Sequence, residues 1–294
     1  MVESNKSFQV VAHTIMALLS LFCLLPFVLL IVSSITNEAM LIRDGYSFFP
    51  RSIDFSAYKY LLFDSGNVLR GYGISILVAI VGTLVSLVLT TLFAYPLARK
   101  NLPGKGPIAF FLFFTMLFNG GLVPSYIMWT QTFGIKNTIW ALIVPNLLMA
   151  AFNVILMRTY FTTNVPEAVI EAAKIDGAGE FRTLLNVVLP MSLPVISTLA
   201  LLVGLGYWND WLNGLYYINK DNLYSIQVLL NKMLLDTQFL KSTAAAGMSI
   251  DTSKIPSISI RMAVAVMGTL PIIIAYPFFQ RFFIKGISIG AVKG

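Results

Sequence analysis

Charged side chains are scarce in this sequence. Asp, Glu, Lys and Arg make up 11% of its 294 residues, whereas 57% of the residues are hydrophobic. A soluble globular domain carries about 25% charged residues, so a surface built from this sequence cannot mostly face water. The composition therefore excludes an ordinary soluble protein and predicts an integral membrane protein.

Cysteine and histidine occur once each. Cys23 lies in an apolar run and has no second cysteine with which to form an internal disulfide. His13 is the single histidine, which excludes His-based catalytic triads and metal sites with several histidines. We therefore expect no metal site in this chain.

The motif of nucleotide hydrolysis is also missing. The sequence has no G-x-x-x-x-G-K-[ST] phosphate loop, and the segment PGKGP at 103–107 has neither its spacing nor the hydroxyl residue that would bind Mg²⁺. HExxH and CxxC are absent as well. We predict a non-catalytic chain that binds no cofactor, so another polypeptide must supply any energy that it uses.

The net charge of +7 raises the alternative of a nucleic-acid-binding protein. The basic residues, however, fall between the apolar runs and near the last residues, and no polar helix carries a basic stripe with interleaved aromatic residues. Basic residues in such positions orient membrane helices and meet anionic lipid headgroups. We expect membrane lipid, and no nucleic acid, as a partner.

Long apolar runs are what the sequence has in abundance. A membrane-spanning helix needs about 20 mainly apolar residues, and six windows meet this requirement. They are approximately residues 10–33, 72–97, 107–129, 138–160, 188–211 and 262–284. The third window is interrupted by Asn119-Gly120-Gly121 and Pro124, a break that is tolerated where backbone lines a cavity or is buried in protein. The sequence predicts a single all-α transmembrane domain, 1–294, with six transmembrane helices.

Six spans place both termini on one side of the membrane, and the basic residues only weakly indicate which side. With the N-terminus inside, ten Lys and Arg residues fall inside and ten outside. The short connections favour this orientation, because Arg99, Lys100 and Lys105 cluster after the second span. The external loops would then be 34–71 and 212–261.

Both external loops contain helical patterns. In the first, apolar residues recur at helical spacing at Phe55, Tyr58, Leu61 and Leu62. In the second, one helical face carries Ile226, Leu229, Leu230, Met233 and Leu234. Packing on the protein's own bundle and docking of an external partner are both consistent with the second face.

The loop 162–187 is short and rich in charge. After Pro166, the residues Glu167, Glu171 and Lys174 share one helical face, and Gly177 is suited to end the helix in a left-handed conformation. A second helical piece is expected at about 179–187. The loop could rest on lipid headgroups, but its apolar residues are mostly small. We favour a rigid peg for a cytoplasmic partner.

This loop resembles the EAA loop of bacterial ABC importer permeases, E-A-A-x₃-G-x₉-I-x-L-P. Glu171-Ala172-Ala173 is followed after three residues by Gly177, and after nine more by Val187-Val188-Leu189-Pro190, with Val187 in place of the isoleucine. The segments EAAKIDGA at 171–178, YWNDW at 207–211 and IKGISIGAVKG at 284–294 are similar to the carbohydrate-uptake (maltose/oligosaccharide) branch. FNGGLVPSY at 118–126 and NVILMRTYF at 153–161 resemble a subgroup linked to complex oligosaccharides.

The resemblance implies a type I ABC importer transmembrane domain in the bacterial cytoplasmic membrane, with both termini and the loop 162–187 in the cytoplasm. It implies four kinds of interaction: a second homologous permease, expected to form a heterodimer; two cytoplasmic ATPase subunits, which use ATP and Mg; an extracytoplasmic solute-binding protein; and lipid. The ATPase-coupling residues would be Glu171, Ala172, Ala173, Asp176 and Gly177.

Sugars need hydrogen bonds to their hydroxyls and aromatic rings against their apolar faces. Trp208, Asn209, Asp210 and Trp211 offer both kinds of group at the end of the fifth span. Asn119, Asn146 and Asn153 are further candidates for the substrate pathway. Alternatively, the tryptophans form an interfacial aromatic belt and the asparagines bond to neighbouring helices.

The function that we predict is that of a permease subunit which translocates an oligosaccharide by alternating access. One alternative is an ABC permease for a non-sugar solute such as a peptide or polyamine. A gradient-driven secondary transporter or channel should show inverted repeats or several intramembrane carboxylates, and neither is evident. An intramembrane enzyme is disfavoured by the missing catalytic motifs.

Overall fold

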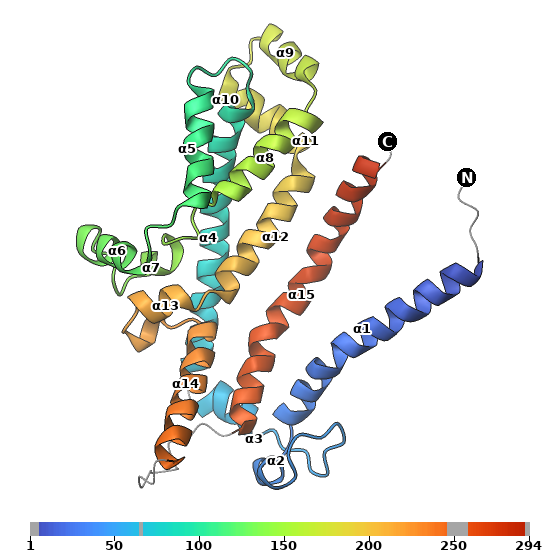
Figure 1. The fold of residues 1–294 in the computed structure, drawn as a ribbon, viewed down its shortest axis with the longest axis vertical. Helices are drawn as coiled ribbons and strands as arrows, with labels where there is room; N and C mark the ends of the chain where they lie inside the picture. Colours follow the sequence, from blue (N-terminus) through green and yellow to red (C-terminus); the bar gives the residue numbers. More distant parts are fainter. Residues whose placement is uncertain (1–5, 65–66, 246–257, 292–294) are drawn as a thin grey trace. The chain divides into compact units, whose positions relative to one another are not determined.

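The computed structural model describes residues 6–64, 67–245 and 258–291 (Figure 1). Regular structure within these ranges is helical, apart from one isolated antiparallel bridge between Thr36 and Ile53. The chain divides into two compact units, one made of residues up to 69 with 229–271, and the other of residues 70–228 with those from 272 onward. The all-α architecture expected from the apolar runs is confirmed.

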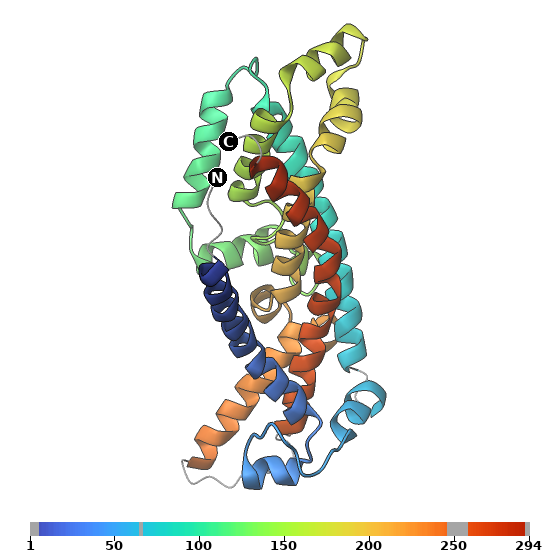
Figure 2. The same ribbon diagram turned by 90° about the vertical axis from the view of Figure 1, so that its right-hand side faces the viewer.

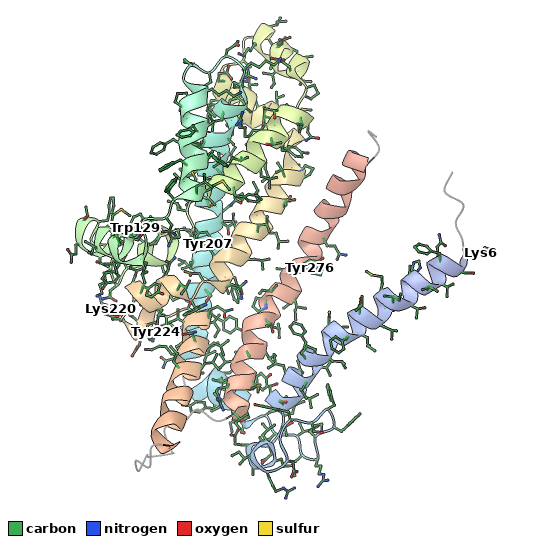
Figure 3. The ribbon with its side chains drawn as sticks, in the orientation of Figure 1. Lys6, Trp129, Tyr207, Lys220, Tyr224 and Tyr276 are labelled. Atoms are coloured by element: carbon green, nitrogen blue, oxygen red, sulfur yellow. The ribbon has the colours of Figure 1, made fainter. Side chains whose placement is uncertain are left out.

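The first unit begins with α1 (Lys6–Ser34). Its 29 residues, at about 1.5 Å each, give a helix roughly 44 Å long, which exceeds the bilayer core of about 30 Å. Of its residues only Ser33 and Ser34 are buried, and Figure 3 shows its side chains standing out along the helix from Lys6 onward. A helix so apolar and so little covered by its own chain needs lipid or another subunit around it.

The segment after α1 folds into short helices. These are α2 (Glu38–Asp44), α3 (Ser56–Lys59) and the π-helical turn η1 (Tyr60–Asp64). Leu61 and Ala57 are buried, so the helix expected from the apolar spacing in this loop is present. The carboxylate of Glu38 accepts hydrogen bonds from the N–H groups of Ile258 (2.7 Å) and Ser259 (2.8 Å), which satisfies free donors at the start of α15 (Ile258–Ala291).

The core of the second unit lies between α4 (Asn67–Ala98), α8 (Ala151–Asn164) and α12 (Leu193–Asn209). Its fully buried members include Ala94 and Leu97 from α4, Val154 and Met157 from α8, and Leu199 from α12. Beside this core runs α5 (Lys105–Leu117), whose Leu112 joins it.

The remaining elements of the second unit sit at the ends of these helices. At the start of α12 lie α9 (Glu167–Ile175), α10 (Glu180–Thr183), the π-helical turn η3 (Leu184–Val188) and α11 (Leu189–Met191). At its far end lie α13 (Leu212–Tyr217), η4 (Asp221–Leu223) and α14 (Ile226–Ala245), which continues into the first unit. Figures 1 and 2 show α9 and α13 at opposite ends of α12.

Three of the described helices are long and apolar enough to cross a membrane by themselves, namely Lys6–Ser34, Asn67–Ala98 and Ile258–Pro277. Two bent pairs qualify when each is joined, Lys105–Leu117 with Leu122–Thr132 (112°) and Glu180–Met191 with Leu193–Asn209 (83°). The described residues therefore contain three such helices, or five spans with the bent pairs.

The window 107–129 contains the interruption that the sequence predicted. It is divided into α5, α6 (Leu122–Ile127) and the π-helical turn η2 (Met128–Thr132). Gly121 has φ +87°, which a helix does not allow, and Asn119 Oδ1 accepts a hydrogen bond from Gly121 N–H (2.9 Å). The side chain thus competes with the helical hydrogen-bond pattern at the Asn-Gly-Gly sequence.

The window 138–160 is not a continuous helix either. It consists of the four-residue α7 (Trp140–Ile143), an irregular segment and α8. Pro145 lacks an N–H for the ladder, and Asn146 has φ +63°. Asparagine tolerates this left-handed conformation better than most residues, so the chain reverses here rather than extending the helix.

Candidate coupling site and far end of α12

The helix α9 has a defined start and end. Pro166 is the N-cap with φ −62°, and Glu167 lies in the first turn, where a negative charge stabilises the helix dipole. At the other end, Gly177 N–H donates to the Lys174 carbonyl (3.0 Å) and Ala178 N–H to the Ala173 carbonyl (2.9 Å). With φ +76° at Gly177, this pair of bonds is a Schellman cap. The predicted helix and its glycine stop are therefore both present.

The predicted coupling residues at the tip of this loop lie on the surface of the chain. Glu171, Ala172, Asp176 and Gly177 are exposed, and Ala173 is half-buried. Two large apolar side chains are exposed beside them, Ile175 (87%) and Phe181 (65%). Exposed apolar groups next to charges are typical of a surface that binds another protein, so the loop has the form of a docking knob.

The opposite side of α9 faces the unit's core. Ile170 is 8% exposed and belongs to the same apolar cluster as Phe161 and Val165. It is the one buried residue of the nine in this helix. Apolar packing therefore anchors α9 at one point near its middle.

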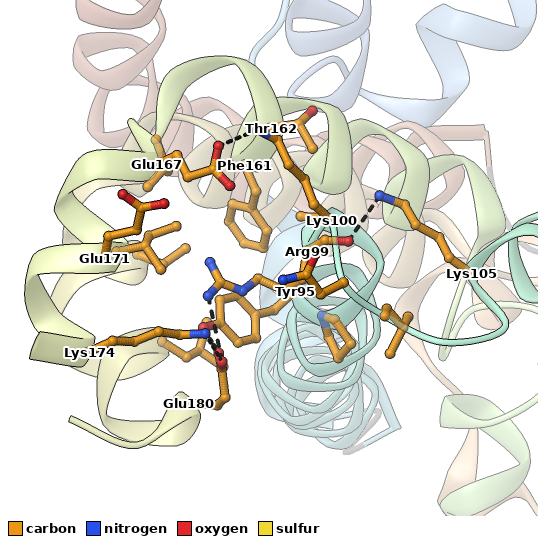
Figure 4. A pocket seen from close by; sticks show the side chains of 18 of the residues that line it. Tyr95, Arg99, Lys100, Lys105, Phe161, Thr162, Glu167, Glu171, Lys174 and Glu180 are labelled. Carbon is orange, nitrogen blue, oxygen red and sulfur yellow. Dashed lines mark hydrogen bonds and ion pairs between the residues drawn. The ribbon is translucent and has the colours of Figure 1, made fainter. Parts of the chain in front are cut away.

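Charged contacts hold the two ends of α9. Near its start, Lys100 Nζ donates to Glu167 Oε2. Near its end, Lys174 Nζ lies 2.8 Å from Glu180 Oε1. The hydrogen bond that Lys100 donates to Glu167 raises the pKa of the exposed Lys100 ammonium group above its ordinary value. Figure 4 shows both contacts at the rim of one cavity.

The carboxylate of Glu180 contacts three other polar side chains. Besides Lys174, its carboxylate accepts a hydrogen bond from the Tyr95 hydroxyl (2.6 Å), and Arg99 Nη2 lies 3.5 Å away. Tyr95 belongs to the last turn of α4 and Arg99 directly follows this helix. The contact therefore joins the loop to α4 across 85 positions of sequence, which sequence patterns could not reveal.

The cavity below α9 has a volume of about 940 Å³. Its lining combines the apolar ends of α4 and α8 with ionisable side chains from three segments (Figure 4). These ionisable side chains are Tyr95, Arg99, Lys100, Lys105, Glu167, Glu171, Lys174 and Glu180. A helix that spans such a space can change its position without displacing tightly packed side chains.

The predicted pathway residues Trp208 to Trp211 lie at the far end of α12 and differ in their surroundings. Trp208 is 6% exposed, and its ring centroid lies 6.2 Å from that of Tyr72. Asp210 Oδ1 accepts hydrogen bonds from Leu212 N–H (3.2 Å) and Asn213 N–H (3.3 Å), as a helix N-cap does. Asn209 and Trp211 are exposed.

Of the three predicted asparagines, Asn146 comes near this end of α12. The adjacent Pro145 carbonyl accepts a hydrogen bond from Asn213 Nδ2 (3.0 Å), and the neighbouring Ile143 carbonyl from the Tyr207 hydroxyl (2.9 Å). Tyr207 is labelled in Figure 3. Asn119 lies elsewhere, in the turn after α5, and Asn153 in the first turn of α8. Asn213 is a buried polar residue at this end that the sequence analysis missed.

Comparison with known proteins identifies the family to which the chain belongs. The family of binding-protein-dependent transport system inner membrane components matches residues 71–289. The chain belongs to this family. It is a multi-pass membrane permease, and the resemblance of its loop 162–187 to ABC importer permeases is confirmed at the level of the family.

Relatives of this permease cover almost its full length. It is 33% identical to the polygalacturonan/rhamnogalacturonan transport system permease protein YtcP of Bacillus subtilis (strain 168), over 99% of both chains. It is 38% identical to protein LplC of the same organism, over 92% of this chain and 90% of that one. Among solved structures, a bacterial ABC transporter involved in the import of the acidic polysaccharide alginate matches with a TM-score of 0.79 and 27% identity, covering 96% of this chain and 99% of the other.

These matches confirm the carbohydrate-importer branch recognised in the sequence. They also confirm that the chain is a non-catalytic transport subunit, because the family consists of membrane permeases. Membership in a binding-protein-dependent system implies partner ATPase subunits and a solute-binding protein.

Proposed function

We propose that this permease passes an oligosaccharide from an extracytoplasmic solute-binding protein through the membrane by alternating access, driven by ATPase subunits that dock on α9. One observation carries the proposal. A capped helix with exposed Glu171 and Ile175 is followed by α10, η3 and α11, which lead through a bend of 83° into α12. The far end of α12 bears the polar and aromatic pathway candidates.

The proposed mechanism is the rigid transfer of motion along α12. Closure of the ATPase pair around ATP and Mg would move the exposed tip of α9. The 17 residues of α12, at about 1.5 Å each, would carry that motion roughly 25 Å to Asn209 and Trp211. A bundle of packed helices responds as a body rather than by compression, so the pathway would open alternately to the two sides.

We propose that Glu171, Ala172, Ala173, Asp176 and Gly177 form the ATPase contact together with Ile175 and Phe181. For the substrate pathway, the exposed Asn209, Trp211 and Asn146 are the best placed to contact a sugar. Trp208 and Asp210 would act mainly by stabilising the structure of this end. Asn119 and Asn153 would contribute polar groups from the turn after α5 and from α8.

The finer topology also belongs to the proposal. We infer six crossings within a single transmembrane domain, with the segment 138–160 crossing as a broken helix, both termini and the loop 162–187 in the cytoplasm, and 34–71 and 212–261 outside. A second homologous permease would complete the pathway as a heterodimer. This chain would bind no cofactor itself.

The substrate class that we propose is an oligosaccharide released from an acidic polysaccharide. Two relatives similar to this chain over nearly their full length carry polygalacturonan/rhamnogalacturonan and alginate in their descriptions, and both kinds of polymer contain uronic acids. Neutral oligosaccharides are the alternative, since an arabinooligosaccharide permease of Halalkalibacterium halodurans is 27% identical over 95% of this chain.

Uptake by the assembled complex tests the proposal. The permease pair, ATPase and binding protein would be reconstituted in proteoliposomes and supplied with labelled oligogalacturonates, oligoalginates or neutral oligosaccharides. We expect ATP-dependent uptake of an acidic oligosaccharide, and loss of uptake in a Glu171→Ala variant that still inserts into the membrane. Asp44→Ala removes an exposed carboxylate of α2 and serves as the matched control. Equal uptake by both variants and the unaltered chain would refute the role of α9.

A further inference from the structure

The helix α9 is poorly anchored by apolar contacts. Ile170 is its one buried residue, and the cavity of about 940 Å³ opens beneath it. A single buried side chain fixes one point of a helix but leaves it free to tilt about that point. The contacts at its two ends must therefore set its orientation.

Both end contacts lead to the same place, the end of α4. Lys100, two residues after this helix, bonds to Glu167 at the start of α9. Lys174 near the end of α9 is paired with Glu180. Glu180 also accepts a hydrogen bond from the hydroxyl of Tyr95, in the last turn of α4. The loop 162–187 is thus joined covalently to α12 and by polar contacts to α4.

We propose that Glu180 is a positioning residue of the coupling step, which links the movement of α9 to α4 as well as to α12. This inference rests on the proposed function of α9 as the ATPase-docking helix. Without the link, only the Lys100–Glu167 contact would join α9 by polar groups to the end of α4, and a force on α9 would tilt it over the cavity. With the link, both ends of α9 are held to α4, so the force moves α4 and α12 together.

The chemistry of Glu180 suits this role. Lys174 and the Tyr95 hydroxyl donate hydrogen bonds to one carboxylate, and Arg99 adds a positive charge at 3.5 Å. Hydrogen bonds to a charged acceptor are stronger than neutral ones. The side chains of Lys174 and Glu180 are about half exposed, whereas that of Arg99 is 20% exposed. Ion pairs with such exposure are screened by salt, so the link should weaken as ionic strength rises, while the apolar anchor at Ile170 should not.

Two variants separate the parts of the link. Glu180→Gln keeps an amide oxygen that can accept the Tyr95 hydroxyl but removes the charge that attracts Lys174 and Arg99. Tyr95→Phe removes one hydroxyl and leaves the ring. Asp44→Asn, an equal loss of one carboxylate in α2, is the control.

Each variant would be measured in the complete reconstituted complex for three quantities, the amount of assembled complex, ATP hydrolysis and oligosaccharide uptake. We expect assembly to be unchanged and uptake per ATP hydrolysed to fall by about fivefold or more in Glu180→Gln, the lower end of typical coupling between sites. Raising the salt concentration should reduce this ratio in the unaltered complex and reduce it less in Glu180→Gln, where the exposed Lys100–Glu167 pair is the remaining end contact of α9. The double variant should lose more coupling than either single variant, because Glu180→Gln keeps an acceptor for the Tyr95 hydroxyl and Tyr95→Phe removes that hydroxyl.

An unchanged ratio of uptake to hydrolysis in Glu180→Gln and Tyr95→Phe would overturn the inference while leaving the proposed function intact. Parallel loss of assembly, hydrolysis and uptake would overturn it too, because the residue would then only stabilise the fold. Restored uptake in a charge-swapped Lys174→Glu/Glu180→Lys chain would support the link even if the single variants assemble poorly. Failure of the unaltered complex to take up any oligosaccharide would instead contradict the proposed function.

Discussion

The ring of Tyr207 lies directly against the backbone of Gly82. A Cβ atom at position 82 would come within 2.5 Å of Tyr207 Cζ, closer than any two such atoms can approach. The Tyr207 hydroxyl donates to the Ile143 carbonyl (2.9 Å). One side chain of α12 thus contacts both α4 and α7, one residue before Trp208, and the glycine makes this contact sterically permissible.

Replacement of Gly82 by alanine should therefore destabilise the second unit. Overpacking of a close contact costs about 1–3 kcal/mol, so we expect Gly82→Ala to lower the Tm of the detergent-solubilised protein. The control is Gly73→Ala in the same helix, where an added Cβ meets nothing within 4 Å. If both variants melt like the unaltered chain, Tyr207 does not hold the position described here.

Gly177 and Gly179 form a second pair of glycines that can be compared by substitution. Its φ of +76° costs a residue with a Cβ about 1–2 kcal/mol, so Gly177→Ala should fray the end of α9. Gly179, with φ −68° and no atom within 4 Å of an added Cβ, should tolerate alanine. We expect less ATPase to co-purify with Gly177→Ala than with Gly179→Ala. Equal recovery of ATPase would show that the cap is not needed for docking.

Two substitutions of Asp210 distinguish the role of its negative charge from its role in accepting hydrogen bonds at the start of α13. Asp210→Asn keeps an oxygen that can accept from the N–H groups of Leu212 and Asn213, whereas Asp210→Ala removes it. Because loss of an N-cap costs about 1 kcal/mol, we expect the alanine variant to be less stable and the asparagine variant to retain both stability and uptake. Loss of uptake in a stable asparagine variant would show that the carboxylate itself serves the substrate pathway.

The orientation of the loop 162–187 can be measured by cysteine labelling. Cys23 is the single cysteine, so Cys23→Ser provides a background without thiols. In this background, Ile175→Cys should react with an impermeant maleimide in inside-out vesicles, and Lys220→Cys in intact cells. Bound ATPase should protect the first position and not the second. Labelling of the Ile175→Cys variant from outside the cell would refute the proposed topology.

The sequence was a good guide wherever a property is local. The extent of α9, its glycine stop and the chain break at Asn119-Gly120-Gly121 follow from residues that lie within a few positions of each other. Left-handed glycine and asparagine conformations depend on the residue's own covalent structure, and for this reason Gly177 could be predicted. The length and apolarity of α1 and α4 likewise follow directly from composition.

Properties that depend on distant partners were not predictable in this way. Asn146 looked like a polar residue within a span, but it lies with φ +63° in the irregular segment between α7 and α8. Trp208 looked available to substrate and is instead buried, because Tyr72 from α4 lies beside it. The contact between Tyr95 and Glu180 joins residues whose separation leaves no periodic signal, so the link between the loop and α4 emerges only from the structure.

The number of residues in α12 fixes both the distance between its two ends and their relative rotation about the helix axis. With 3.6 residues per turn, each residue added to or removed from its 17 would turn everything beyond it by about 100°. Such a change would take the Tyr207 ring off Gly82 and swing Trp211 to another side of the bundle. The number of residues between Leu193 and Asn209 thus sets an angular register, and insertions should be tolerated far better in the loops than within this helix.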